Sequence, residues 1–275
     1  MNTNRLSKPS VVSEKPTGMS AAVEDRHFVT ALARGLEVLA CFHSGEAQLG
    51  NQELAELCKL PQSTGSRLTM TLTRLGYLIH LPESRRYRLG MSTLALGSAM
   101  MSRLDVRLVA RSLMQELATV AGCSVALAAR ERLSMIYVET CRPQTSLAVA
   151  SDIGQRFPLV NSATGRAYLA VATEAERHGI LRALQASGEG DQAAIRAAVD
   201  QAVQEHASLG VSCAFGSWQK DINGIGRAFQ PGGGLPPMAI SCVGPSSRMS
   251  RTYLLNEVRP RLIELTQRLE ATMPR

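Results

Sequence analysis

Hydrophobic residues near the start of the chain recur at helical spacing. Val29, Leu32, Leu36 and Leu39 lie three or four positions apart, as on one face of an amphipathic helix. This pattern predicts a helix from residue 29 to about residue 42, with these four residues on its buried side.

Two further helices are expected directly afterwards. The first covers residues 51–59, with Asn51 as its cap, and buries Leu54, Leu57 and Cys58. Proline disfavours a helical residue before it and suits the first turn of a helix, so the Leu60-Pro61 pair should end this helix and begin the next.

The third helix, residues 61–75, has two different faces. Its apolar stripe is Leu68, Leu72 and Leu75. The opposite face carries only hydroxyl and guanidinium side chains, with no carboxylate. These residues are Ser63, Thr64, Ser66, Arg67, Thr71 and Arg74.

A short hairpin is predicted next, with strands at 77–80 and 86–89 around a turn at 81–85. Three helices and a hairpin form the layout of a winged helix-turn-helix. The whole chain has a net charge of +7, and residues 59–90 hold six Lys or Arg against one acidic residue, Glu83. Most of the positive excess therefore lies in the segment that would face DNA.

In a helix-turn-helix the start of the second motif helix enters the major groove, here residues 61–75. Ser63 and Thr64 suit phosphate oxygens, because the first turn of a helix has free N–H groups. Arg67 is the best candidate for a guanine edge. The remaining candidates for DNA contact are Ser66, Thr71 and Arg74 on the same helix, and Arg85 and Arg86 at the hairpin tip. The alternatives are that Arg67 and Arg74 only form a solvated face, or that the winged helix binds protein.

The rest of the chain predicts a second domain of α+β class. Residues 91–104 form a linker helix, and residues 105–275 alternate helices with strands as in an antiparallel sheet covered by helices. Strands are expected near 124–130, 133–139, 146–150, 210–215, 223–229 and 238–243, and helices near 105–121, 163–172, 174–185, 191–208 and 248–272.

Residues 1–26 have no hydrophobic period and predict a disordered tail, so the DNA-binding domain is assigned to residues 27–90. The start of the chain lacks the apolar core of a secretory signal, and nowhere do 18 apolar residues run together, so a cytoplasmic protein with no membrane contact is expected. The low aromatic content, 4%, argues against a surface that stacks single-stranded bases.

Residues 162–165, Ser-Ala-Thr-Gly, begin a helix after a strand that contains a proline. Backbone N–H groups at such a position favour a carboxylate, so a small organic acid would fit there. The alternative is that Ser162 serves only as the helix cap.

Several segments of the sequence resemble a known protein family. The segments ALARGLEVLACF (31–42), NQELAELCKLPQSTGSRLTMTLTRLGYL (51–78) and RRYRLG (85–90) are similar to the DNA-binding half of the IclR family of bacterial transcription regulators. FPLVNSATGRAYLA (157–170) and AISCVGPSSRMS (239–250) are similar to its effector-binding domain. The resemblance covers about residues 28–272.

The resemblance implies a regulator without an enzymatic activity, built from a winged helix-turn-helix, a linker helix and a mixed α/β, GAF-like domain. Dimers or tetramers would bind pseudo-palindromic double-stranded DNA operators, with contacts through the first domain and the linker helix. A small metabolite would change repression or activation. By position, its pocket would involve Ser162, Ala163, Thr164, Asp221, Gly224 and Ser241.

The chain departs from the family after the strand at 210–215, where many members have acidic residues and this chain has Ala214, Phe215, Gly216 and Ser217. Phe215 or Trp218 could therefore face an aromatic or longer effector. Arg227 could pair with an effector carboxylate or point to solvent.

Catalytic, cofactor-binding and metal-binding motifs are not found in the sequence. Two alternatives to metabolite control remain. One is a redox sensor that uses Cys141 or Cys242, and the other is an enzyme tethered to DNA.

Overall fold

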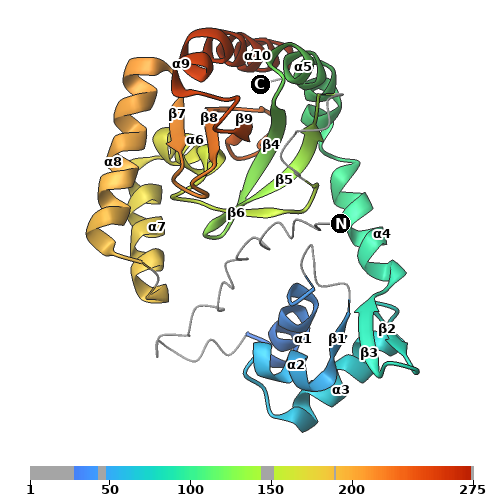
Figure 1. The fold of residues 1–275 in the computed structure, drawn as a ribbon. Helices are drawn as coiled ribbons and strands as arrows, with labels where there is room; N and C mark the ends of the chain where they lie inside the picture. Colours follow the sequence, from blue (N-terminus) through green and yellow to red (C-terminus); the bar gives the residue numbers. More distant parts are fainter. Residues whose placement is uncertain (1–27, 43–47, 144–151, 189, 274–275) are drawn as a thin grey trace, which may run out of the picture.

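The computed structural model describes residues 28–42, 48–143, 152–188 and 190–273. The expected tail (1–26) and the strand expected at 146–150 lie outside these residues. Figure 1 shows an N-terminal domain and a larger C-terminal domain, with one helix, α4, running between them.

The N-terminal domain is a winged helix-turn-helix, as the sequence predicts. Its elements in order are α1 (Thr30–Ala40), β1 (Leu49–Gly50), α2 (Asn51–Leu57), α3 (Gln62–Arg74), β2 (Leu78–Leu81) and β3 (Arg86–Leu89). The strands form an antiparallel sheet in the order β1-β3-β2. Helices α2 and α3 cross closely at Gly65, where an added Cβ would lie 3.3 Å from the Cβ of Ala55.

The prediction that the apolar stripe of α1 is its buried face is wrong. Leu32 and Leu36 are 62% and 57% exposed, and the buried residues of α1 are Gly35 and Val38, on another side of the helix. Helical spacing marks an apolar stripe but does not say what covers it. The small core of this domain is filled by Val38, Leu49, Leu54, Cys58, Leu72 and Leu78, so the apolar stripe of α1 is left facing outward.

Two other residues expected in the core, Leu57 and Leu75, are also exposed. Leu75 is the C-cap residue of α3, and Leu57 ends α2. On α3 the buried side is formed by Gly65, Thr69 and Leu72.

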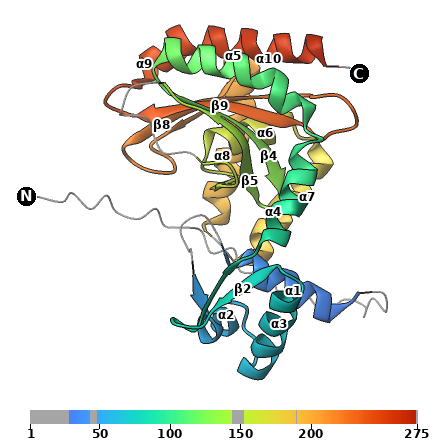
Figure 2. The same ribbon diagram turned by 90° about the vertical axis from the view of Figure 1, so that its right-hand side faces the viewer.

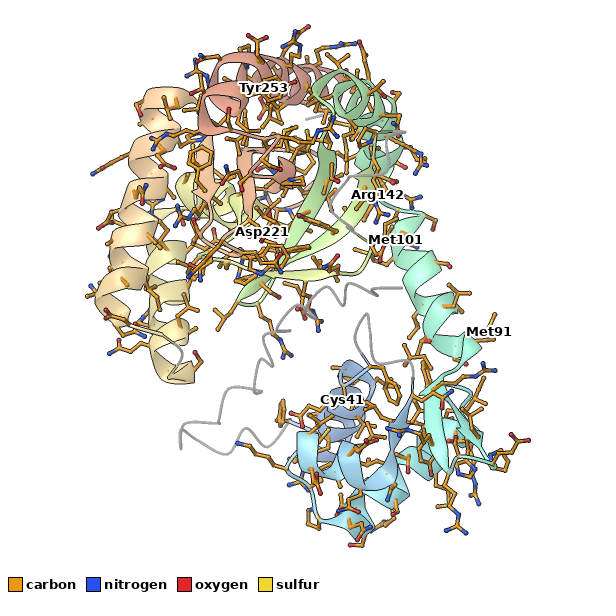
Figure 3. The ribbon with its side chains drawn as sticks, viewed as in Figure 1. Cys41, Met91, Met101, Arg142, Asp221 and Tyr253 are labelled. Carbon is orange, nitrogen blue, oxygen red and sulfur yellow. The ribbon has the colours of Figure 1, made fainter. Side chains whose placement is uncertain are left out.

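Helix α4 (Met91–Met101) is the expected linker helix and contains no charged residue. None of its residues is buried. Met91 and Met101 mark its two ends in Figure 3. Its exposed apolar side chains include Met91, Leu94, Leu96 and Met100.

The C-terminal domain is a three-layer structure around one antiparallel sheet, in agreement with the α+β class. Its strands are β4 (Ser124–Glu131), β5 (Ser134–Cys141), β6 (Arg156–Pro158), β7 (Ser212–Phe215), β8 (Ile222–Phe229) and β9 (Met238–Pro245), in the order β6-β5-β4-β9-β8-β7. Its helices are α5 (Asp105–Ala121), α6 (Ala163–Val171), α7 (Glu174–Ser187), α8 (Gln192–Leu209), α9 (Arg251–Tyr253), the π-helical turn η1 (Leu254–Val258) and α10 (Arg259–Thr272).

The two faces of the sheet carry side chains of different size. Helices α5 and α10 cover one face, and α6 lies on the other with α7 and α8 outside it (Figure 2). The α5 and α10 face is built from large residues, among them Val125, Leu127, Ile225 and Ile240. Along the same strands the α6 face carries small residues, namely Ala126, Ala128, Gly224, Gly226 and Ala239. Helix α6 can therefore approach the sheet more closely than a helix over large side chains could.

A buried carboxylate joins α5 to the sheet. Glu139 on β5 is 1% exposed, and its two oxygens accept hydrogen bonds from Arg107 and Arg111 of α5, each at 2.7 Å. Both oxygens of this buried charge are thus neutralised by guanidinium groups, as a buried carboxylate requires.

Candidate functional site

The exposed face of α3 carries the side chains expected to contact DNA. Ser63, Ser66, Arg67, Thr71 and Arg74 are exposed, and Thr64 is half-buried. They lie opposite the residues that pack against α2 and the domain core. No carboxylate shares this face, because α3 contains no acidic residue.

Ser66 also has a structural role. Its hydroxyl accepts a hydrogen bond from Asn51 Nδ2 at 2.6 Å and donates to the Gln62 carbonyl at 3.0 Å. Thr69 donates to the other end of the same amide, Asn51 Oδ1, at 3.1 Å. Asn51, predicted as the cap of α2, is instead the first residue of that helix after the N-cap Gly50, and its side chain ties α2 to α3.

The two arginines at the wing differ in freedom. Arg85 is exposed at the turn, where its φ of 54° lies in the left-handed region. Arg86 instead donates to both oxygens of Glu53 on α2, at 2.8 and 2.5 Å. The pKa of Glu53 is lowered mainly because the Gly50 N–H donates to its carboxylate, and also by Arg86. Arg86 thus holds the wing against α2.

In the C-terminal domain, Ser162 is the N-cap of α6. Its hydroxyl accepts from the Gly165 N–H at 3.1 Å, donates to the Pro158 carbonyl at 2.7 Å, and lies 3.3 Å from the Thr164 hydroxyl. The Arg166 N–H donates to the Ser162 carbonyl. The first-turn N–H groups of Ala163 and Thr164 have no partner among the described residues and remain as donors.

A narrow cavity opens at this helix end. It is lined by Tyr137, Phe157, Ser162, Ala163, Ala214, Trp218, Ile222, Gly224, Ser241 and Val243. None of these lining side chains is charged. The cavity volume is about 20 Å³, which is enough for one water molecule but not for an aromatic ring. A larger ligand could therefore enter only if a lining side chain moved.

Aromatic rings and hydroxyl groups meet in this cavity. The chain has only five tyrosines, five phenylalanines and one tryptophan, and Tyr137, Phe157 and Trp218 all line it. The ring centroids of Tyr137 and Phe157 are 4.2 Å apart, and Trp218 meets Phe157 edge-on at 5.0 Å. Burial raises the pKa of Tyr137 to about 12, against smaller lowering effects from the nearby hydroxyls of Ser241 and Thr164.

Ser241 is a buried polar residue of this cavity, and its hydroxyl lies near the Tyr137 hydroxyl. It is 0% exposed, and its hydroxyl completes no hydrogen bond of normal geometry with the described residues. A buried polar group without a full hydrogen bond destabilises the folded protein, and a bound ligand or water molecule could supply the missing bond.

Four residues that the sequence suggested as possible effector contacts are not among the lining residues. Thr164 is buried on α6 and could contribute only its backbone N–H. Asp221 is exposed and is not among the lining residues, although its neighbour Ile222 is (Figure 3). Phe215 points to the other face of the sheet, under the guanidinium of Arg251. Arg227, for which effector pairing and exposure to solvent were both open, also points there and donates to the Gly210 carbonyl rather than lining the cavity. Trp218 does line the cavity. Strand alternation explains why Phe215 and Arg227 face away, because each follows by one residue a position on the α6 face of the sheet, Ala214 or Gly226.

Five lining residues were not expected from the sequence, namely Tyr137, Phe157, Ala214, Ile222 and Val243. Tyr137 comes from β5, outside the segments that resemble the family, and Phe157 is the first residue of one of those segments, on β6. Aromatic residues are scarce in this chain, which marks each of them as a candidate for a binding site, but the sequence does not show that Tyr137, Phe157 and Trp218 lie together.

A wider, open groove lies between α7 and α8, lined by His178, Leu181, Arg182, Arg196 and Asp200. Its polar side chains are at the surface, and among the described residues none of the buried unpartnered polar atoms belongs to its lining. The smaller cavity at α6 is therefore the better ligand site.

Cys141 and Cys242 do not fit a redox sensor. They are 2% and 0% exposed. Burial raises the pKa of Cys141, and the hydrogen bond with Cys123 together with burial raises the pKa of Cys242. Reactive cysteines need the opposite, an accessible thiol with a low pKa. Across the described residues, no group of three or more potential metal ligands is found, and no helix has the length and apolar character needed to cross a membrane.

Both domains match known family models. The family model "Bacterial transcriptional regulator IclR C-terminal" matches residues 98–271, and "IclR helix-turn-helix domain" matches residues 31–82. The chain belongs to the IclR family of bacterial transcriptional regulators.

Similar proteins agree with this family assignment. The HTH-type transcriptional regulator TsaQ1/TsaQ2 of Comamonas testosteroni is 34% identical over 267 residues, which cover 96% of this chain and 92% of that protein. The crystal structure of an IclR family transcriptional regulator from Brucella abortus is 40% identical, with a TM-score of 0.85 over 97% of this chain and 100% of that chain. The IclR-family chain is accordingly a DNA-binding transcriptional regulator and not an enzyme.

The crystal structure of an IclR homolog from Microbacterium hydrocarbonoxydans, complexed with 4-hydroxybenzoate, shares the fold at 22% identity. Its TM-score is 0.64, over 88% of this chain and 100% of that chain.

The two serines of the cavity should differ in their effect on stability. Ser241→Ala removes an unsatisfied hydroxyl, so the free energy of unfolding should stay within about 0.5 kcal/mol of the wild type. Ser162→Ala removes a cap and should lower it by about 1–2 kcal/mol. Urea unfolding followed by Trp218 fluorescence measures both, since Trp218 is the sole tryptophan and lies in this domain. Equal destabilisation by the two variants would contradict the unsatisfied state of Ser241.

Proposed function

We propose that this IclR-family regulator binds a double-stranded operator as a dimer through α3 and the wing, and that a small aromatic carboxylate in the α6 cavity controls that binding. The observation that carries the DNA part is the exposed face of α3, which has hydroxyl and guanidinium groups and no carboxylate.

On the DNA, Ser63 and Thr64 at the start of α3 would contact phosphates, which fixes the position of the helix in the groove. Arg67 and Arg74 lie one and three turns further along the same face, so Arg67 is closer to the groove floor and reads a guanine edge. Arg85 at the wing tip is free to contact a phosphate. The Arg86 guanidinium is committed to Glu53, so its role is to fix the wing.

The apolar stripe of α1 supports a dimer. Leu32 and Leu36 are exposed, and α4 adds a helix without a charged or buried residue. Monomers seldom leave continuous apolar surface of this kind in water, so a second copy of the chain would cover it. A two-fold dimer also presents two copies of α3 to the two halves of a pseudo-palindromic operator.

The α6 cavity supports an aromatic acid as effector. The N–H groups of Ala163 and Thr164 at the positive end of α6 favour a carboxylate, and the Ser241 hydroxyl supplies a further hydrogen bond. Tyr137, Phe157 and Trp218 would surround the ring. The effector contacts are thus Ser162, Ala163, Thr164, Gly224 and Ser241, with Gly224 contributing room rather than a side chain. Trp218, in the loop between β7 and β8, is the lining side chain that would move.

Two arginine variants distinguish base reading from phosphate contact. Arg67→Ala should weaken operator binding by about 1–3 kcal/mol and relax its sequence preference. Arg85→Ala should weaken binding to all sequences alike and reduce the slope of affinity against salt concentration. Fluorescence anisotropy with operator and scrambled duplexes at several salt concentrations measures both, with the exposed Arg196→Ala as a control of equal charge change. Unchanged operator affinity of the Arg67 variant at fixed salt would refute the groove assignment.

If the apolar side of α1 is the dimer interface, a charged side chain placed there should weaken dimerisation. Leu36→Glu should halve the sedimenting mass in analytical ultracentrifugation, because an unpaired carboxylate cannot be buried in an apolar interface. Val120→Glu, on the exposed side of α5, is a matched control and should sediment like the wild type. A Leu36→Glu protein with unchanged mass would place the interface elsewhere.

The effector proposal predicts a response to ring and charge together. Benzoate or 4-hydroxybenzoate should raise the Tm of the full chain and change Trp218 fluorescence, and Ser241→Ala should reduce the affinity by about 1 kcal/mol. Benzamide, which keeps the ring without the charge, and acetate, which keeps the charge without the ring, should bind more weakly. Tight binding of acetate with unchanged Trp218 fluorescence would contradict an aromatic effector.

A further inference from the structure

Two cysteines face each other in the DNA-binding domain. Cys41 follows the last residue of α1 and Cys58 follows the last residue of α2, and their sulfur atoms are 3.3 Å apart. Both are free thiols. Cys41, labelled in Figure 3, is half-buried, whereas Cys58 is 8% exposed. One member of the pair is thus open to solvent and the other is within reach of it.

The remaining cysteines are shielded. Cys123, Cys141, Cys213 and Cys242 are all 2% exposed or less. Cys123 and Cys242 also interact with each other, but both lie in the core between the sheet and α5 and α10. Of the six thiols, Cys41 is therefore the one that a dissolved reagent meets first.

The thiols of Cys41 and Cys58 are chemically unequal. The hydrogen bond from Cys58 stabilises the Cys41 thiolate and lowers its pKa, against opposing effects of burial and of the Glu37 carboxylate. The same hydrogen bond and burial raise the pKa of Cys58. This asymmetry suits an attacking thiolate at Cys41 and a resolving thiol at Cys58.

We propose that Cys41 and Cys58 form an oxidisable thiol pair that a hydroperoxide converts into an intramolecular disulfide, and that this disulfide weakens operator binding. The Cys41 thiolate attacks the terminal oxygen of the hydroperoxide, ROOH. The O–O bond breaks, and with one proton the products are Cys41 sulfenic acid and ROH. The Cys58 thiol then attacks the Cys41 sulfur, which forms the S–S bond and releases water. In sum, two thiols are oxidised and one hydroperoxide is reduced to ROH and water.

The disulfide would act on the turn that leads into α3. Directly after Cys58, Lys59 adopts a φ of 51°, and the Leu60 N–H donates to the Ala55 carbonyl at 2.8 Å. Pro61 then begins α3 as its N-cap. A disulfide requires its sulfurs at about 2.05 Å, so they must close by more than 1 Å from their present separation. That movement displaces the end of α2 or of α1, and the turn transmits it to the first residues of α3, which contact phosphates in the proposed function.

A metal site is a poorer use of the same pair. Zinc in a structural site needs four ligands, and no third Cys, His, Asp or Glu joins Cys41 and Cys58 within the described residues.

The test uses the full chain, treated with hydrogen peroxide in small molar excess and then with dithiothreitol. Two of the six thiols should be lost without dimer cross-linking, and the disulfide should join Cys41 to Cys58. Both cysteines lie in the tryptic peptide 35–59, so a protease specific for glutamate, which can cut between them at Glu46, Glu53 and Glu56, is needed to map the link. Operator affinity should fall several-fold and return with dithiothreitol.

The variants separate this pair from the other thiols. Cys41→Ser and Cys58→Ser should bind the operator like the reduced wild type and no longer respond to peroxide, while Cys141→Ala should respond like the wild type. Mapping the link needs neither a variant nor DNA, so it tests the pair even if a variant folds poorly or the operator assignment fails. Six free thiols after peroxide, or a link between other cysteines, would overturn the proposal. A Cys41–Cys58 link with unchanged operator affinity would overturn the regulatory part alone.

Discussion

The small residues on one face of the C-terminal sheet are the constraint on which the position of α6, and the cavity beside it, depends. A Cβ at Gly226 would lie 2.3 Å from the Ala163 carbonyl oxygen, so only glycine allows α6 to sit where it does. Gly165 is constrained in the same way by the backbone of Leu159, 2.0 Å from its would-be Cβ. These contacts bring the positive end of α6, with its free N–H groups, directly over the strands that carry Ser241 and Tyr137. The opposite face has no comparable space, because large side chains fill it.

In the N-terminal domain the decisive element is the junction of α2 with α3. Gly65 lets the two helices cross closely, and the Asn51 side chain links them by two hydrogen bonds. Glu53 fastens the wing to the same helix through Arg86. Helix α3 is thus placed by α2, the turn and the wing together. The Cys41 and Cys58 pair lies at one end of this arrangement, so a change there reaches the DNA-facing side chains through few intermediates.

The exposed apolar side chains of α1 and α4 are the surface that a second copy of the chain would cover in the proposed dimer. The N-terminal core is small, and it is already closed by Val38, Leu54 and Leu78. Among the described residues, the apolar side chains Leu32 and Leu36 of α1 and Leu94 and Leu96 of α4 stay exposed, whereas Met101 at the end of α4 packs against the C-terminal core. Two domains joined by such a helix can respond to one another only if that helix is held in place, which the proposed dimer provides. Ligand binding at α6 and DNA binding at α3 would then act through a shared, ordered linker.

The sequence by itself determined the order of the elements, the winged helix-turn-helix, and the concentration of positive charge on α3 and the hairpin, because these follow from local spacing, proline and charge. Its family resemblance pointed to the start of α6, where the structure has a cavity. Only the tertiary structure decided which apolar stripe is buried, so that Leu32 and Leu36 moved from the expected core to the surface. It alone brought Tyr137, Phe157 and Trp218 to Ser241, turned Phe215 and Arg227 to the opposite face, and paired Cys41 with Cys58. The physical reason is that the spacing of apolar residues shows which side of a helix or strand is apolar. The residues that pack against that side come from distant parts of the chain, so local spacing does not identify them.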